Sequence, residues 1–544
     1  MVTALFFGCS KAETKEVTAV SADAGTVAVA ATTRVSDIID ENDMFSDRDL
    51  DPSYTASEAS TITLKDSAST SDSSAVSIDG DTITITAEGI YEISGSLSNG
   101  QIIVDVADEN AKVQLVFDGV DINCETSAAV YVKQADKVFI TLADGSKNTL
   151  SNSSDFVQTD DNNVNAVIYS RDDLTLNGSG SLTVNAKYGH AISSKDDLKL
   201  CGGTYVINAD EKNGLDANDS VRITSSNITI TSVNDAIHAE NDEDETQGFV
   251  YIKDGTVTIN AEDDGIHASA AILIKDGTVD IQKSTEGVEA RMIEVQGGTV
   301  DVTASDDGFN ASSGSSTTST TTTTDQTAVS TNSTETEVIE TAFGGQQPEM
   351  SGEMPSGEAP SGDMQQGNMA GGGTMDTDSS CYLLISGGVV TVNSEGDGLD
   401  SNGYMYIAGG YTVVYGPTNS GNGALDSGVS IEVSGGTVIA LGASGMAEGF
   451  SDSSTQGAIL CNSVSGSKGD TVTLTDSNGN EIISIESLKS FGSVAVSTPD
   501  ITQGSTYTLS AGSTSTDIEM SSLVYTDSQG NMMGGGMQGG NRGF

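Results

Sequence analysis

Residues 253–281 read KDGTVTINAEDDGIHASAAILIKDGTVDI, in which the phrase Lys-Asp-Gly-Thr-Val starts at 253 and again at 275. Each copy opens a run of alternating apolar and polar residues, which is typical of a β-strand with one buried face. The phrase Gly265–Ala268 between them marks another strand. A unit this short cannot close a hydrophobic core alone, so such units must stack on one another. The stretch therefore predicts one coil of a right-handed parallel β-helix.

The second phrase of this stretch, Gly-Ile-His-Ala, recurs along the chain at a spacing of roughly 22 to 25 residues where no insertion intervenes. Its copies begin at Gly189, Gly214, Ala236, Gly265, Gly287, Gly308 and Gly398. The Leu/Asn ladder of a leucine-rich repeat is missing from these coils, which argues against that solenoid. We expect an all-β chain, a solenoid of roughly 22-residue coils that ends in a β-rich C-terminal cap.

Changes of composition divide the chain into seven segments. We expect a lipoprotein signal remnant at 1–9, a disordered tether at 10–60, the N-terminal part of the β-helix at 61–312, a disordered Thr/Ser and Gly/Met insertion at 313–380, the C-terminal part of the β-helix at 381–455, the β-rich cap at 456–526 and a disordered Gly/Met tail at 527–544. The insertion and the tail have too little branched apolar content to fold. Their methionines could alternatively bind soft metal ions.

The first nine residues form a short apolar run that ends in Gly8 and Cys9. This pattern predicts lipid attachment at Cys9, with an ordinary secretory cleavage region as the alternative. We therefore expect an extracellular protein at the cell surface, held to the membrane only by its lipid. The other four cysteines are widely spaced and form no CxxC pair, which favours buried thiols over disulfides. They are Cys124, Cys201, Cys381 and Cys461.

The charge of the chain limits its partners. There are 79 Asp and Glu residues against 22 Lys and Arg residues, which gives a formal net charge of −57. A nucleic-acid partner is not expected, because Lys and Arg are needed to displace the counterions of a polyanion. Acidic glycans would be repelled in the same way unless a cation bridged the two polyanions.

Two positions of the recurring phrase are acidic in most coils: the residue before the glycine and the second residue after it. These residues are Asp216, Asp235, Asp264, Glu286, Glu289, Asp307, Asp397, Asp400 and Asp426. Equivalent positions stack in a parallel β-helix, and bare carboxylates about 5 Å apart repel by roughly 1 to 3 kcal/mol per pair. Calcium takes six to eight oxygen ligands, so we predict that these columns bind Ca²⁺. Alternatively, Asp occurs here only because turns favour it, although Glu286 and Glu289 are not turn formers.

Histidines take the place of the acidic residue in two consecutive coils, at His238 and His267. A transition-metal or acid/base role is one interpretation, and stacked turn histidines without a further role are the favoured one. No catalytic residue is assigned, because the basic candidates Arg222 and Arg291 lie in no distinguishing motif. The even spread of acidic residues favours a binding surface over a pair of catalytic carboxylates.

These phrases, together with Phe45–Asp51, Tyr131–Val138 and Ser170–Leu176, resemble a family of bacterial surface carbohydrate-binding proteins that was formerly catalogued as a domain of unknown function. The resemblance covers about residues 45–455. It implies a pectate-lyase-like parallel β-helix that binds calcium and plant cell-wall polysaccharides, including acidic pectic chains, without established catalysis. The long insertion and the two histidines depart from the family pattern.

The predicted function is non-catalytic, calcium-dependent binding of an acidic polysaccharide such as pectin or polygalacturonate at the bacterial cell surface. The chain has no Trp, the strongest stacking platform for neutral sugars, although Tyr404, Tyr406 and Tyr411 could contribute. A calcium-dependent pectate-type lyase is the first alternative. A surface adhesin is the second.

Overall fold

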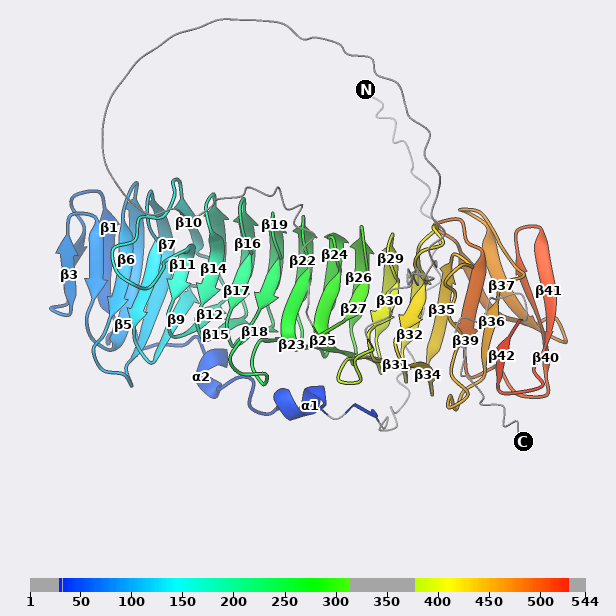
Figure 1. Cartoon of the computed structure of the whole chain (residues 1–544). Helices are drawn as coiled ribbons and strands as arrows, with labels where there is room; N and C mark the ends of the chain where they lie inside the picture. Colours follow the sequence, from blue (N-terminus) through cyan, green and yellow to red (C-terminus); the bar gives the residue numbers. More distant parts are fainter. Residues whose placement is uncertain (1–28, 32, 314–376, 528–544) are drawn as a thin grey trace, which may run out of the picture. The chain divides into compact units, whose positions relative to one another are not determined.

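The computed structural model describes residues 29–31, 33–313 and 377–527, all of which belong to one compact unit of the chain. The unit is nearly all-β, with 2% helix, and consists of a parallel β-solenoid of about 12 turns (Figure 1). The predicted parallel β-helix is thus confirmed. Neither of its two helices, each of four residues, is long enough to cross a membrane.

Each full coil contributes one strand to each of three parallel rows. Row 1 contains β4 (Thr82–Ile85), β6 (Gln101–Asp105), β8 (Val130–Gln134), β11 (Ala166–Ser170), β14 (His190–Ser194), β17 (Leu215–Ala217), β20 (Ile237–Ala239), the first halves of β23 (Ile266–Ile274) and β25 (Val288–Val295), β27 (Phe309–Ala311), β30 (Leu399–Ser401) and β33 (Leu425–Ser427). The candidate site described below lies on this row.

Row 2 follows row 1 in each coil. It contains β1 (Ser60–Lys65), β5 (Gly89–Leu97), β7 (Lys112–Cys124), β9 (Lys137–Leu142), β12 (Asp173–Gly178), β15 (Asp197–Cys201), β18 (Ser220–Thr224), β21 (Phe249–Ile252), the second halves of β23 and β25, β28 (Tyr382–Ile385), β31 (Tyr404–Ile407) and β34 (Ser430–Val433).

Row 3 completes the coil. It contains the ends of β5 and β7, then β10 (Lys147–Asn152), β13 (Ser181–Ala186), β16 (Thr204–Ala209), β19 (Asn227–Ser232), β22 (Thr256–Ala261), β24 (Thr278–Lys283), β26 (Thr299–Ala304), β29 (Val389–Ser394), β32 (Tyr411–Tyr415) and β35 (Thr437–Gly442). At the N-terminal end, the short strands β2 (Thr70–Ser71) and β3 (Val76–Asp79) pair antiparallel with β1 and β4.

The core of the solenoid is built from ladders of identical or similar apolar residues. On row 3, Val257, Val279 and Val300 are fully buried and occupy the same register in three consecutive coils. Tight turns between rows need glycine, as at Gly277, where φ is +95° and a Cβ would lie 2.6 Å from the Gly255 carbonyl oxygen. The alternation of apolar and polar residues along each strand and the Asp-Gly turns therefore act together to fix which face of the strand is buried.

The insertion interrupts the sequence but leaves the register of the coils unbroken. Phe309 to Ala311 on β27 pair with Leu399 to Ser401 on β30, and β25 pairs with β28. The Ser313 side chain forms a hydrogen bond with Asp378, so the ends of the insertion meet at one turn. Residues 314–376, most of the predicted insertion, lie outside the described residues.

The last coil is covered by antiparallel strands. β39 (Ser493–Ser497) pairs antiparallel with β35 and with β36 (Ala458–Cys461), which also pairs in parallel with β42 (Val524–Thr526). A separate sheet contains β37 (Thr471–Asp476), β38 (Glu481–Glu486), β40 (Thr506–Ala511) and β41 (Thr514–Glu519). This cap shields the edge of the solenoid from pairing with another chain.

The prediction of a disordered tether at 10–60 is wrong for the described part of that range. Residues 33–54, here called the strap, carry α1 (Val35–Ile38) and α2 (Asp47–Leu50), which lie along row 2 (Figure 1). Val35, Ile39 and Met44 are buried in a cluster with side chains of row 2. A polar composition concealed these few apolar residues, whose partners come from coils far along the chain. Residues 10–28 lie outside the described part.

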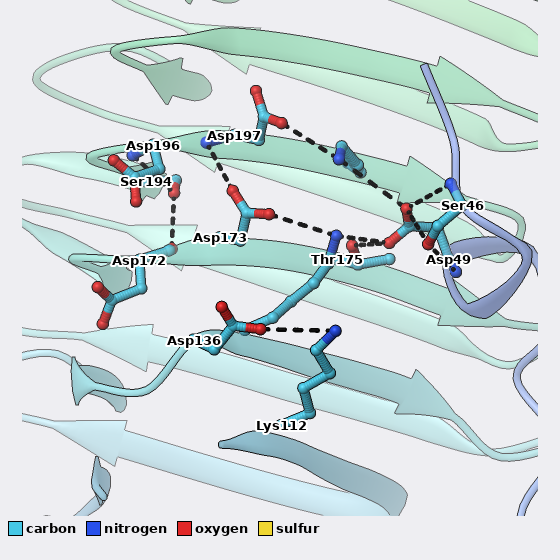
Figure 2. Close-up of polar contacts among 12 residues, drawn as sticks. Ser46, Asp49, Lys112, Asp136, Asp172, Asp173, Thr175, Ser194, Asp196 and Asp197 are labelled. Atoms are coloured by element: carbon cyan, nitrogen blue, oxygen red, sulfur yellow. Dashed lines mark hydrogen bonds and ion pairs between the residues drawn. The ribbon is translucent and has the colours of Figure 1, made fainter. Parts of the chain in front are cut away.

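A buried ionic network fastens the strap to row 2 (Figure 2). The Asp49 side chain is fully buried, 2.8 Å from Lys137 Nζ and 3.9 Å from Lys199 Nζ, and it accepts a hydrogen bond of 2.7 Å from Thr175 Oγ1. Burial alone would raise the pKa of Asp49, but Lys137 and Lys199 hold it well below its usual range. The carboxylate is therefore ionised, as a buried charge with cationic partners should be.

Candidate functional site

The structure brings all nine predicted acidic residues together in two neighbouring columns on the outer face of row 1. The strand column contains, in parallel register, Asp216, His238, His267, Glu289, Asn310, Asp400 and Asp426. The turn column contains Asp235, Asp264, Glu286, Asp307 and Asp397. The backbone carbonyl of each of these residues accepts a hydrogen bond from a backbone amide of the preceding coil. Parallel strands are about 4.8 Å apart, so each column places one side chain per coil at that spacing.

The first part of the columns, here called the imidazole segment, contains Asp216, Asp235, His238, Asp264, His267 and Glu289. Asp216 is buried, and both of its carboxylate oxygens are engaged. Oδ2 accepts from Ser193 Oγ at 2.8 Å, while Oδ1 lies 3.1 Å from Asn213 Nδ2 and 3.2 Å from His238 Nδ1. Although burial opposes ionisation, these partners hold the pKa of Asp216 well below its usual range.

The two histidines supply positive charge within this segment. Their rings stack, with centroids 5.2 Å apart and an interplanar angle of 17°. Burial alone would lower their pKa values, but the carboxylates around them raise the pKa of His238 to about 9 and that of His267 to about 11. Protonated imidazoles thus neutralise part of the acidic column.

The second part of the columns, here called the carboxylate segment, contains Glu286, Asp307, Asn310, Asp397, Asp400, Asp426 and Glu448. None of these carboxylates forms an ion pair with a cation of the described residues. Burial and neighbouring carboxylates raise the pKa of Glu286, Asp307 and Asp400 to about 8. Acidic groups are therefore gathered here without a cation to favour their ionisation.

Asn310 and Glu448 belong to the carboxylate segment but were not predicted as site residues. Asn310 Nδ2 donates to Glu286 Oε2 at 2.9 Å, which leaves Asn310 Oδ1 buried without a hydrogen-bond partner in the described part of the chain. Glu448 accepts from Ser427 N at 3.1 Å, and burial with the charge of Asp426 raises its pKa to about 7. Alignment of the recurring phrase would have found Asn310. Glu448 carries no such signal, because it lies beyond the last copy of the phrase.

The donor set of the carboxylate segment fits a hard cation. Carboxylates and the orphaned amide oxygen of Asn310 are the ligand types that Ca²⁺ takes, and an added cation would remove the repulsion that raises their pKa values. Ca²⁺ fits less well around Asp216, because both carboxylate oxygens of Asp216 already have hydrogen-bond partners and histidine side chains supply the positive charge. The predicted calcium residues thus fall into two chemically different parts.

A further acidic column lies at the turn from row 1 to row 2 (Figure 2). In the Asp-Asp-Leu phrases, Asp173 and Asp197 point to Lys137 and Lys199, with distances of 3.4 and 3.1 Å. The preceding residue, Asp196, has no such partner in the described chain, and burial together with nearby carboxylates raises its pKa to about 6. The second aspartate of each Asp-Asp-Leu phrase therefore belongs to the ionic network that binds the strap.

Other residues that the sequence suggested for chemistry are elsewhere. Arg222 donates to Asp197, Ser220 and the Met44 carbonyl, so it belongs to the strap network. Arg291 lies two residues from Glu289 on β25 and pairs with Glu245 at 3.4 Å.

The three tyrosines suggested for sugar stacking all contribute to packing, and one of them is inaccessible. Tyr406 is buried, and its hydroxyl accepts from Ala30 N, so its prediction as a sugar platform is wrong. Tyr404 and Tyr411 pack against buried clusters. The four described cysteines are buried free thiols, whereas Cys9 lies outside the described residues.

Comparison with known proteins shows similarity to carbohydrate-binding domain-containing proteins. Residues 79–328 match the family model of carbohydrate-binding domain-containing proteins, which spans the columns from Asp216 to Asn310. A carbohydrate-binding domain-containing protein of Acetivibrio thermocellus is 46% identical over 129 residues, or 23% of this chain and 45% of the relative. The chain thus matches less than half of that relative's length.

A solved structure of a polysaccharide lyase-like protein from C. thermocellum, in a gadolinium derivative, is also similar in sequence. It is 37% identical, with a TM-score of 0.39, over 44% of this chain and 93% of that chain.

Proposed function

We propose that this protein binds polysaccharide without cleaving it, on the face of row 1, and that Ca²⁺ held by the carboxylate segment makes an acidic glycan such as polygalacturonate the ligand. One observation carries the proposal: half-buried carboxylates, in register over successive coils, have raised pKa values and no cationic partner in the described chain. The match of residues 79–328 to carbohydrate-binding domain-containing proteins supports a glycan as the partner.

The carboxylates of Asp307, Asp397, Asp400 and Asp426, with Asn310 Oδ1, lie on three successive coils and would hold such ions between neighbouring coils. Bound calcium would supply positive charge and coordination positions for uronate carboxylates. The carboxylate segment extends over successive coils, which presents an extended glycan with several weak contacts in a line. Affinity then comes from multivalency rather than from one deep pocket. The net charge of −57 requires such a cation, since two polyanions repel one another.

The geometry offers little to a lyase. Such an enzyme needs a strong or cationic base next to the bound uronate, and Arg222 is engaged with the strap. Arg291, two residues after Glu289 on β25 and paired with Glu245, is the cation that a pectate-type lyase, the alternative function, would use. Absorbance of unsaturated products on polygalacturonate, with Arg291→Ala as the comparison, separates the two functions. An adhesin would instead bind protein surfaces.

The proposal places the protein outside the cell, with a lipid on Cys9 as the membrane anchor. Its support is the apolar run that ends in Gly8 and Cys9. Detergent partitioning of the Cys9→Ser variant tests it, because loss of the lipid should move the protein to the aqueous phase.

The calcium-dependent binding is tested by measuring retention on immobilised polygalacturonate with calcium and with excess chelator. The variant Asp307→Asn/Asp400→Asn should lose binding. The control Asp280→Asn/Asp301→Asn removes the same charge from two register partners on row 3 and should bind as the unmodified protein does. Undiminished binding in chelator would contradict the calcium requirement, and equal losses in both variants would contradict the location.

A further inference from the structure

We propose that Asp264, His267 and Glu289 form a separate site for a divalent transition-metal ion of the Zn²⁺ type. This inference goes beyond the proposed function, since it concerns another ion and needs no glycan. One ligand atom from each residue lies within 4.8 Å of the others. One imidazole nitrogen and two carboxylate oxygens are a set that zinc takes when it keeps one position open, and the ion would displace the proton from His267 Nδ1.

Distances within the group leave room for a small ion to replace the hydrogen bonds of His267. His267 Nδ1 is 3.0 Å from Glu289 Oε2 and 3.5 Å from Asp264 Oδ2. A single Nδ1 carries one proton, yet two carboxylate oxygens converge on it. Ligands about 2.0 to 2.1 Å from a tetrahedral ion are about 3.3 Å from each other. The two observed distances fall on either side of that value.

Neighbouring groups hold the ligands in place. Asp264 Oδ1 accepts from Glu286 N at 3.3 Å, and Glu289 Oε1 accepts from Ser312 Oγ at 3.1 Å. These bonds occupy the outer oxygen of each carboxylate, so the inner oxygens remain directed at Nδ1. β23 and β25 pair with His267 opposite Glu289, and this backbone register fixes the position of the histidine relative to the glutamate. Such supporting contacts orient metal ligands in proteins.

His238, one coil earlier, shows the contrasting arrangement. Its Nδ1 lies 3.2 Å from Asp216 Oδ1, while its Nε2 lies 3.5 Å from Glu240 Oε2 and 3.9 Å from Asp235 Oδ2. Each nitrogen thus faces its own carboxylates, which suits an imidazolium that donates on both sides. His238 therefore serves as an internal control for the site at His267.

An imidazole ligand separates this site from the carboxylate segment. Ca²⁺ takes oxygen ligands, whereas Zn²⁺ and its neighbours in the transition series bind imidazole well. The protein should accordingly hold a transition-metal ion at His267 while calcium is in excess.

Co²⁺ provides the direct test, since a four-coordinate Co²⁺ ion gives visible absorption bands. We expect the metal-stripped full-length protein to show these bands in the presence of excess calcium and to lose them on addition of Zn²⁺. His267→Gln should lower the affinity for Co²⁺ by at least about tenfold, the usual effect of disturbing a metal site. His238→Gln should retain the bands, and Glu289→Gln is a second ligand variant if His267→Gln melts early.

Three results would overturn the assignment: no bands with the unmodified protein, displacement of Co²⁺ by calcium, or equal losses in His267→Gln and His238→Gln. The outcome is independent of glycan binding. Asp307→Asn/Asp400→Asn should keep the Co²⁺ bands even where it loses polygalacturonate, so failure of one proposal is distinguishable from failure of the other.

Discussion

The carboxylate of Asp49 on α2 lies 2.8 Å from the Nζ atom of Lys137 on β9, and its side chain has no exposed surface. Lys137 also approaches Asp173, and Lys199 lies between Asp49 and Asp197. The pair therefore belongs to a chain of alternating charges that joins the strap to row 2. The residues that make up this chain come from sequence positions far apart.

Asp49→Asn should destabilise the protein by about 3 kcal/mol, near the lower end of the cost of breaking a buried ion pair. The lower end is expected because Lys137 and Lys199 keep Asp173 and Asp197 as partners. Chemical denaturation measures the loss. Asp47→Asn, an exposed change on the same helix, should leave the unfolding free energy nearly unchanged, and an equal loss in both variants would contradict a role of the buried pair.

Acidification should weaken the same contact. The pKa of Asp49 lies below its ordinary value of 3.8 in the folded protein, so its stabilising contribution is complete above about pH 4 and is lost as the pH falls further. Limited proteolysis should then cut within residues 33–54 before the solenoid. Simultaneous cleavage of the strap and the coils would show that the strap does not open separately.

The carboxylate segment should give stability the opposite pH dependence in chelator. Asp307 and Asp400 have pKa values of about 8 when folded, against an ordinary value of 3.8. A raised acidic pKa means that the folded state binds protons more tightly, so stability should fall as the pH rises from about 4 to about 8. Thermal melting in chelator measures this fall. His238 and His267 contribute in the same direction, so Asp307→Asn/Asp400→Asn should reduce the slope without abolishing it.

Single and combined substitutions should differ sharply in glycan binding. Asp426→Ala should weaken retention on polygalacturonate modestly, since a line of weak sites loses one member, whereas combined loss of Asp307, Asp397 and Asp400 should abolish it. Asp216→Asn should bind glycan normally but unfold more easily by about 1 to 3 kcal/mol, because His238 loses a buried partner. Retention isotherms and melting curves decide between these effects.

Replacing residues 314–376 by a short Gly/Ser linker should leave the melting temperature nearly unchanged. The coils on either side pair directly, with Asn310 opposite Asp400, and Ser313 already meets Asp378. A loss of more than about 2 kcal/mol would be a large effect for a surface change and would show that the segment contributes contacts.

The sequence was sufficient to predict the solenoid because a single phrase reports both the turn and the strand. Gly265–Ala268 and its copies fixed the period, and the parallel register then placed His238 directly beside His267. Columns of side chains follow from such a repeat, so the neighbours of Asp264 along the axis could be anticipated.

Contacts outside the repeat could not be anticipated in the same way. The strap binds through Asp49 and a few apolar side chains, whose partners have no fixed spacing from it in sequence. The difference between the imidazole and carboxylate segments depends on which oxygen faces which nitrogen, as at Asp216, and only the three-dimensional arrangement shows this. Glu448 joins the acidic column from a loop, without the phrase.

The strap has a consequence for how the protein is made and how it unfolds. Coils of a solenoid ordinarily contact only their neighbours, so unfolding can spread from any point. Here Arg48 Nη2 donates to Gln114 Oε1 on β7 at 2.8 Å, while Val35 N donates to the Tyr382 hydroxyl on β28, 347 residues later in the chain. The segment synthesised early therefore cannot complete its docking until most coils have folded. Once docked, it couples distant coils, and we expect them to unfold together rather than one at a time.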